Sequence, residues 1–215
     1  MDLSKFQQIL ARLYTDHSFR ERFFSSPCAT GAELGLSTEE LEQLARLSRA
    51  QVSFFAASLV RKRLNEVRKL LPLSSQVLGQ TFNALFWRYA QTHTLKAQKP
   101  HQRDAVAFSR FVVEEARLKK LDPPWSVDVA RYEAARVEVL ALRRRWAVRR
   151  FHYPLAKLLR SILRVNGEPI PAPQPSLALW IRLSRQGRVW HFVLSIPHLR
   201  WRKGFEYSSS NMFES

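Results

Sequence analysis

Cysteine and glycine are scarce in this chain of 215 residues, which contains one cysteine and six glycines. The single cysteine, Cys28, excludes an internal disulfide and any metal cluster built from several thiolates. The glycines form neither a Gly-x-Gly-x-x-Gly loop nor a Walker sequence, the two loops that hold nucleotide phosphates. No apolar run approaches the ~20 residues of a membrane-spanning helix, and the first residues, Met1–Lys5, do not resemble a secretory signal. We therefore expect a cytoplasmic protein that uses no dinucleotide.

Groups for nucleophilic or metal chemistry are also few. Cys28 follows a proline, and His17 lies eleven residues before it, but nothing in the local sequence pairs the thiol with the imidazole. None of the six histidines is spaced His-x-x-x-His, which would place two ligands on one helix face. His152, His191 and His198 all fall in the last third of the chain without an accompanying carboxylate, so we interpret them as polar members of a basic surface.

Adjacent carboxylates occur at Glu39–Glu40 and at Glu114–Glu115. General acid–base chemistry needs two carboxylates in different environments, whereas these pairs fit ordinary, solvated helix surfaces. We expect no catalytic residues, no metal and no cofactor, and therefore a protein that is not an enzyme.

Negative charge is scarce as well. The chain has 35 Lys and Arg against 18 Asp and Glu, a net charge of +17. Residues 1–142 contain 21 basic and 15 acidic residues, a net charge of +6, whereas residues 143–215 contain 14 basic and 3 acidic residues, a net charge of +11. A field this basic favours nucleic acid, acidic protein surfaces or anionic membranes.

Helical periodicity dominates the first two thirds of the chain. Ser37 and Glu40 form a capping box, in which each side chain satisfies a backbone N–H of the other residue, and Gly31 and Gly35 indicate a loop before it. Apolar residues at helical spacing predict helices over about 3–13, 18–24, 38–47, 50–71, 73–90, 104–118 and 125–145.

The pattern changes near residue 143. Residues 145–153 alternate bulky and charged side chains as a strand does, and a short helix is expected after Pro154. Residues 177–183 and 189–196 predict two strands joined by a hairpin loop. The fold class is therefore α+β, an N-terminal helical bundle (1–142) followed by a small basic α+β domain with an antiparallel sheet (143–203) and a tail (204–215).

Arginines interleaved with aromatic residues form the strongest candidate binding site. Arginine grips carboxylate and phosphate groups with a planar fork, and an aromatic side chain between arginines stacks on a base or on a peptide. An exposed strand edge in the small domain also offers β-addition of an acidic peptide. These features leave peptide, protein, nucleic acid and membrane open as ligands. The candidate residues are Arg143, Arg144, Arg145, Arg149, Arg150, Arg182, Arg185 and Arg188.

Several segments resemble bacterial accessory proteins of multinuclear-iron peptide-modifying oxygenases, a group that includes the methanobactin accessory subunit and some members labelled as DNA-binding. The likeness is diffuse and spans most of residues 3–196. Its segments are Leu13–Asp16, Phe19–Phe23, Glu33–Leu36, Phe54–Arg63, Glu66–Leu73, Leu78–Gly79, Asp128–Glu133 and Ala178–Arg182.

The resemblance implies a partner role. In that family a TIM-barrel subunit holds the iron and performs the oxidation, and the accessory subunit packs against it and helps to recognise a precursor peptide. The expected function is a non-enzymatic accessory protein in a hetero-oligomer, with a TIM-barrel iron oxygenase, an acidic precursor peptide, or both as partners. A nucleic-acid-binding regulator that uses the basic C-terminal domain is the alternative.

Overall fold

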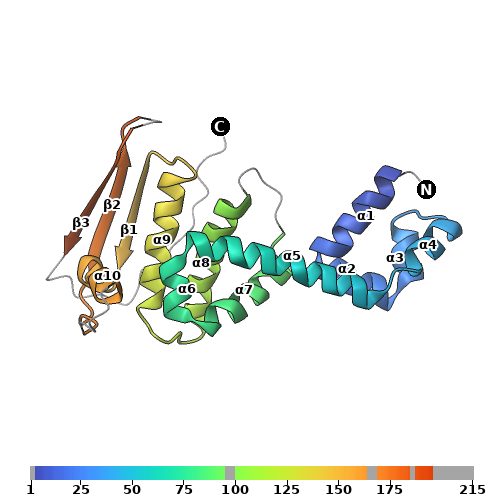
Figure 1. The fold of residues 1–215 in the computed structure, drawn as a ribbon, viewed down its shortest axis with the longest axis horizontal. Coiled ribbons are helices and arrows are strands. Elements are labelled where there is room, and N and C mark those ends of the chain that lie inside the picture. Colours follow the sequence, from blue (N-terminus) through green and yellow to red (C-terminus); the bar gives the residue numbers. More distant parts are fainter. Residues whose placement is uncertain (1–2, 95–99, 164–168, 185–186, 196–215) are drawn as a thin grey trace.

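A computed structural model describes residues 3–94, 100–163, 169–184 and 187–195. The chain is mostly helical and carries one small antiparallel sheet near its C-terminal end, which confirms the α+β class (Figure 1). Among these residues, no helix has the length and apolar character needed to cross a membrane.

The expected segments appear in the expected order with shifted bounds, and one further helix lies over Pro27–Glu33, where a loop was expected. The helices are α1 (Leu3–Thr15), α2 (His17–Ser25), α3 (Pro27–Glu33), α4 (Thr38–Ala45), α5 (Arg49–Leu70), α6 (Pro72–Leu78), α7 (Gln80–Thr92), α8 (Pro100–Leu118), α9 (Ser126–Leu140) and α10 (Leu155–Leu163). The strands are β1 (Trp146–Phe151), β2 (Ser176–Arg182) and β3 (Val189–Ser195).

Helices α1, α2 and α4 pack around their own apolar cluster, to which the start of α5 contributes Val52. The capping box is confirmed at α4, where the Ser37 Oγ accepts from the Glu40 N–H and the Glu40 carboxylate accepts from the Ser37 N–H. The expected loop at Gly31 is wrong, because Gly31 lies inside α3 and is buried. A Cβ there would lie 2.8 Å from the end of the Leu41 side chain, so a larger residue at this position would displace that side chain.

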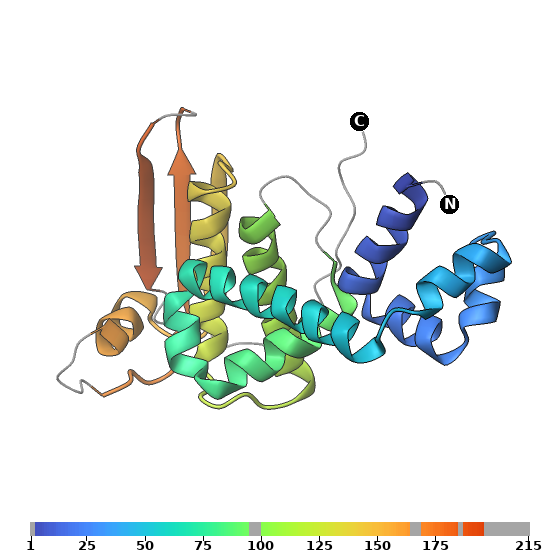
Figure 2. The same cartoon turned by 45° about the vertical axis from the view of Figure 1, so that its right-hand side comes forward.

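The central cluster joins the second half of α5 to α6, α7, α8 and α9. Figure 2 shows α5 running from the N-terminal helices to this group. The single helix expected over 73–90 is two helices, because Gly79 takes φ 52° and ψ −122° between α6 and α7. Only glycine adopts that conformation without strain, so the chain turns there.

Buried ion pairs connect these central helices. The Asp104 carboxylate accepts two hydrogen bonds from Arg63, at 3.0 and 2.9 Å, and a third from the Tyr89 hydroxyl at 2.8 Å. Glu115 of α8 makes a bidentate pair with Arg88 of α7. The expectation that Glu115 is a solvated surface residue is therefore wrong, because the pair with Arg88 holds it in the interior.

The three strands form an antiparallel sheet in the order β1-β2-β3. A third apolar cluster fills the space between this sheet and α9, so α9 contributes to both the central cluster and the sheet cluster. The turn after α9 begins earlier than expected, because the helix ends at Leu140 and Arg143 takes φ 58°. The division at residue 143 stays a prediction, and α9 is the element that connects its two sides.

Candidate partner-binding surface

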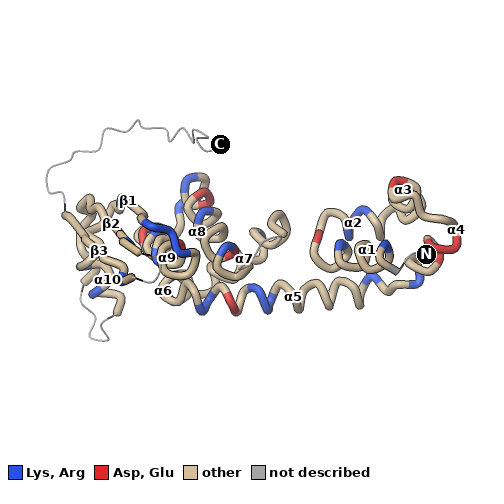
Figure 3. The backbone as a smooth tube through the Cα atoms, turned by 90° about the horizontal axis from the view of Figure 1, so that it is seen from above, with Lys and Arg blue, Asp and Glu red and all other residues tan. Residues whose placement is uncertain are grey.

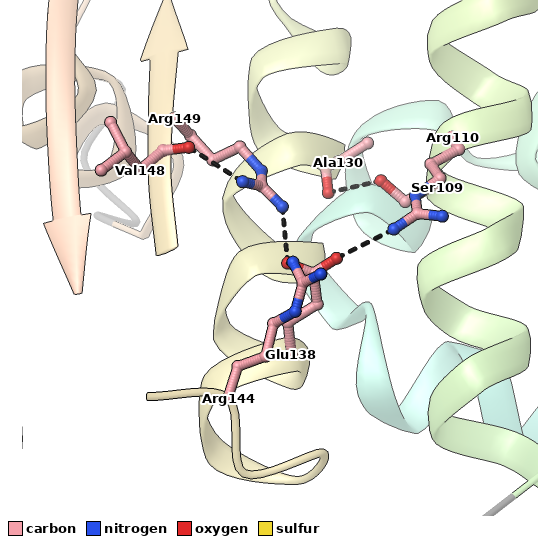
Figure 4. Close-up of polar contacts among 7 residues, drawn as sticks. All are labelled: Ser109, Arg110, Ala130, Glu138, Arg144, Val148 and Arg149. Atoms are coloured by element: carbon pink, nitrogen blue, oxygen red, sulfur yellow. Dashed lines mark hydrogen bonds and ion pairs between the residues drawn. The ribbon is translucent and has the colours of Figure 1, made fainter. Parts of the chain in front are cut away.

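Glu138, near the end of α9, binds three arginines from different elements (Figure 4). One carboxylate oxygen accepts from Arg110 of α8 at 3.2 Å, and the other accepts from Arg144 of the following turn at 3.3 Å and from Arg149 of β1 at 2.5 Å. The Glu138 side chain is only 3% exposed. Since an unpaired buried carboxylate is costly, these arginines neutralise Glu138 and tie the sheet to the helices.

Arg182 makes a second connection to α9. Its guanidinium donates to the Val139 carbonyl at 2.8 Å and more weakly to the Leu140 carbonyl. These are among the last carbonyls of the helix, which lack partners within the helix and carry partial negative charge. Arg182 thus caps the end of α9 from the neighbouring strand, so three of the candidate arginines (Arg144, Arg149 and Arg182) bind α9.

The other candidate arginines lie elsewhere. Arg143, Arg145 and Arg188 are exposed at the end of the sheet where β1 and β3 begin, and Arg150 is exposed near the other end of β1. Figure 3 shows a basic segment along the turn between α9 and β1. Arg185, in the hairpin loop, lies outside the described residues.

One face of the sheet packs against α9. Ala147, Phe151, Ala178 and Trp180 of this inner face contact Ala135 and Val139 of the helix. On β3 the His191 ring stacks on the Trp180 ring, at 4.6 Å between centroids and an interplanar angle of 12°. Partial burial, followed by the charge of Arg136, lowers the pKa of His191, so the imidazole is favoured in its neutral form.

The opposite face, here called the outer face, is apolar. The strand register defines it, because directly paired residues of an antiparallel sheet share a face. In the described part of the chain no element lies over it; Figures 1 and 3 place α9 on the other side of the sheet. Its three rows are Trp146–Ile181–Trp190, Val148–Leu179–Phe192 and Arg150–Leu177–Leu194.

Aromatic residues dominate the exposed area of this outer face. Trp146 is 65% exposed, Trp190 53% and Phe192 49%. The rings of Trp190 and Phe192 lie nearly parallel, at 7° and 6.5 Å between centroids. An aromatic side chain offers about 150–250 Å² when fully accessible, so these three alone present roughly 300–400 Å². Patches of this size on a monomer are often functional.

Basic residues border the outer face in the described part of the chain. From Arg143 to Ser195 the chain has eleven Lys and Arg, and its only acidic residue is Glu168. The buried carboxylate of Glu138 is neutralised by its three arginines on the other side of the sheet. In the described residues the outer face therefore has an apolar centre and a basic border.

The groups considered for metal or nucleophilic chemistry are dispersed. Cys28 is exposed in α3, and in the described residues no three His, Cys, Asp or Glu side chains lie together as metal ligands would. The His152 and Tyr153 backbone N–H groups both donate to the buried Asp128 carboxylate. His198 lies outside the described residues.

Neither Glu138 nor the outer face was predicted from the sequence. Glu138 stands between Val137 and Val139, and five arginines follow within twelve positions, which is a usable signal for a buried carboxylate that they neutralise. The signal for the outer face was a second set of apolar residues in β2 and β3, on the side opposite to the core. Such strands are typical of a sheet that is covered on both faces.

The family comparison matches the helical part of the chain. Residues 46–114 match the family model described as SCO6045-like, C-terminal domain. This segment covers α5, α6, α7 and most of α8, and the sheet lies beyond it. No curated protein matches the chain. The chain is therefore similar to that family in its central helices.

Proposed function

We propose that this protein is a non-enzymatic accessory protein that binds another polypeptide through its C-terminal sheet. The observation that carries the proposal is the outer face, which exposes Trp146, Trp190 and Phe192 together. Tryptophan and other aromatic residues are enriched at protein interfaces, where burying them supplies much of the binding energy.

The partner that we propose is a metal-dependent peptide-modifying enzyme, a TIM-barrel iron oxygenase, with or without its acidic precursor peptide. Support comes from the sequence resemblance to accessory proteins of such enzymes and from the basic border of the outer face. Arg143, Arg145 and Arg188 attract acidic residues and increase the rate of encounter with them.

Co-expression with a TIM-barrel iron oxygenase from the same genome tests this function. The proposal predicts one complex that stays together through size-exclusion chromatography. Two separate peaks for the two proteins at about 10 μM would contradict it, because a complex with a Kd of about 1 μM or less stays largely assembled at that concentration.

Nucleic-acid binding is the second candidate function. Exposed aromatic rings beside arginines are also the parts of a single-strand binding surface, in which bases stack on the rings. Val148, Leu177, Leu179 and Leu194 on the same face offer no ring for stacking, which favours a polypeptide. The affinity for a random single strand distinguishes the two functions, since counterion release makes nucleic-acid binding fall steeply with salt.

A further inference from the structure

The outer face has the composition of a sheet face that a helix covers. An antiparallel sheet with one solvated face normally alternates apolar and polar residues. Here eight of the nine residues in the three outer rows are apolar, and Arg150 is the exception. Because Ala147, Phe151, Ala178 and Trp180 of the inner face already pack against α9, the sheet is suited to a second layer on its other side.

The dimensions of the outer face fit one helix. Neighbouring strands lie about 4.8 Å apart, so three strands span roughly 10 Å. The rows from Trp146 to Arg150 cover about 13 Å at ~3.3 Å per residue. An α-helix is about 10 Å wide and rises 5.4 Å per turn, so a helix of about three turns covers the face. A standard interface of two globular proteins buries about 800 Å² per partner, which exceeds this face.

The basic residues around the outer face favour one sign of charge on the helix that binds there. Arg143, Arg145 and Arg188 stand at the end of the sheet that carries the tryptophan row, and Arg150 stands at the other end. A second copy of this chain is disfavoured, since it would bring two basic borders together in addition to a net charge of +17 on each chain. An acidic border on the incoming helix is complementary.

We propose that the outer face docks one amphipathic helix of a partner polypeptide, with apolar residues on one side and Asp or Glu on its flanks. The inference rests on the proposed function in that it names the part of the partner that binds. The docked helix covers all three rows of the outer face and leaves the sheet between two helices.

Two synthetic helical peptides of about 16 residues test the proposal with the full-length protein. Both carry leucines at i, i+3, i+4 and i+7 spacing; one has glutamates and the other has lysines at the remaining positions. Affinities are measured by fluorescence anisotropy of labelled peptide in about 50 mM salt, where screening is weak. We expect the glutamate peptide to bind at least about ten-fold more tightly than the lysine peptide.

Substitutions distinguish binding at the outer face from attraction by the overall charge of the protein. Phe192→Ser and Leu194→Ser remove exposed apolar side chains of the face. Phe54→Ser is the matched control, because Phe54 is 69% exposed and belongs to the first half of α5, the half that Figure 1 shows beside the N-terminal helices and away from the sheet. We expect each face variant to weaken the glutamate peptide about ten-fold, the loss typical of an aromatic or apolar anchor, and Phe54→Ser to leave it unchanged. Circular dichroism confirms that the variants fold.

Several results would overturn the inference. Equal affinity of the protein for the two peptides would contradict selection by charge. Equal affinity of the Phe192→Ser and Phe54→Ser proteins for the glutamate peptide would show that the outer face is not the binding site. Self-association that depends on Phe192 would assign the face to a second copy, and Phe192-dependent sedimentation with phosphatidylserine vesicles in place of peptide binding would assign it to a membrane.

The two proposals fail in different ways. If the Phe192→Ser and Leu194→Ser proteins still form a complex with the oxygenase, the accessory function stands and the proposed docking on the outer face is wrong. If the glutamate peptide binds in a way that depends on Phe192 but no complex with the oxygenase forms, docking on the outer face stands and the proposed partnership with the enzyme is wrong.

Discussion

Replacing Glu138 with glutamine tests whether one buried carboxylate holds the sheet on the helices. Glu138→Gln keeps the shape of the side chain and removes its charge, so Arg110, Arg144 and Arg149 lose a shared anion. The amide also turns one acceptor into a donor that faces guanidinium N–H groups. We expect the contacts between α9 and β1 to weaken.

The magnitude follows from the exposure of the partners. Removing one member of a buried pair costs about 3–5 kcal/mol when the remaining charge stays buried. Here the arginine side chains are 66%, 58% and 30% exposed and regain water. Hydrogen bonds to charged groups contribute about 1.5–3 kcal/mol, so we expect a loss of about 2 kcal/mol.

Amide hydrogen exchange is the suitable assay, because it reports local opening. A loss of about 2 kcal/mol makes the β1 and β2 amides exchange roughly 30-fold faster, since 1.4 kcal/mol is a factor of ten. Helices α1, α2 and α4 should be unchanged, because they pack around a separate cluster.

Glu114→Gln supplies the matched control for this prediction. Glu114 is an exposed glutamate of α8, so the same substitution there should change stability by less than about 0.5 kcal/mol. If the Glu138→Gln protein exchanges its β1 and β2 amides no faster than the Glu114→Gln protein, the reasoning about the shared carboxylate is refuted.

Three further substitutions test other parts of the structure. Asp104→Asn should cost about 3–5 kcal/mol in denaturant unfolding, because it leaves the Arg63 guanidinium in the interior without its carboxylate; a loss below 1 kcal/mol would contradict this. Ser37→Ala should destabilise α4 by about 1 kcal/mol, seen as faster exchange of its amides, and unchanged exchange would show that the cap is dispensable. The pKa of His191 is lower in the folded protein than in the unfolded chain, so below about pH 6.5 the unfolded chain binds more protons at this residue. The free energy of unfolding therefore falls as the pH drops below about 6.5. His191→Gln should reduce the loss of unfolding free energy between about pH 7.5 and about pH 5; an identical loss in both proteins would exclude His191 as its source.

The features predicted well from sequence are those that local chemistry determines. Ser37 and Glu40 satisfy each other within one turn, so spacing alone identifies the start of α4. The strands β2 and β3 follow from apolar residues bounded by a turn. The break at Gly79 was missed, because a glycine inside a helical pattern is tolerated or turns the chain according to the packing around it.

The candidate site was harder to predict because its parts come from separate elements. A run of arginines around residues 143–150 was visible in the sequence, but Glu138 engages two of them and the run does not show which. Arg182 binds the end of α9 from 42 or 43 residues away. The outer face depends on strand register, which pairs Trp146 with Ile181 and places Trp190 beyond it, and register is set by tertiary pairing.

Crosslinking from the outer face tests the docking of a partner most directly. A photo-crosslinking phenylalanine analogue takes the place of Phe192 in one protein and of Phe54 in a second, and both are irradiated with the glutamate peptide. Docking on the outer face predicts a crosslinked product from position 192 and none from position 54, with loss of the product when excess unlabelled peptide competes. Equal products from both positions, or none from position 192, would contradict a partner-binding role for this face.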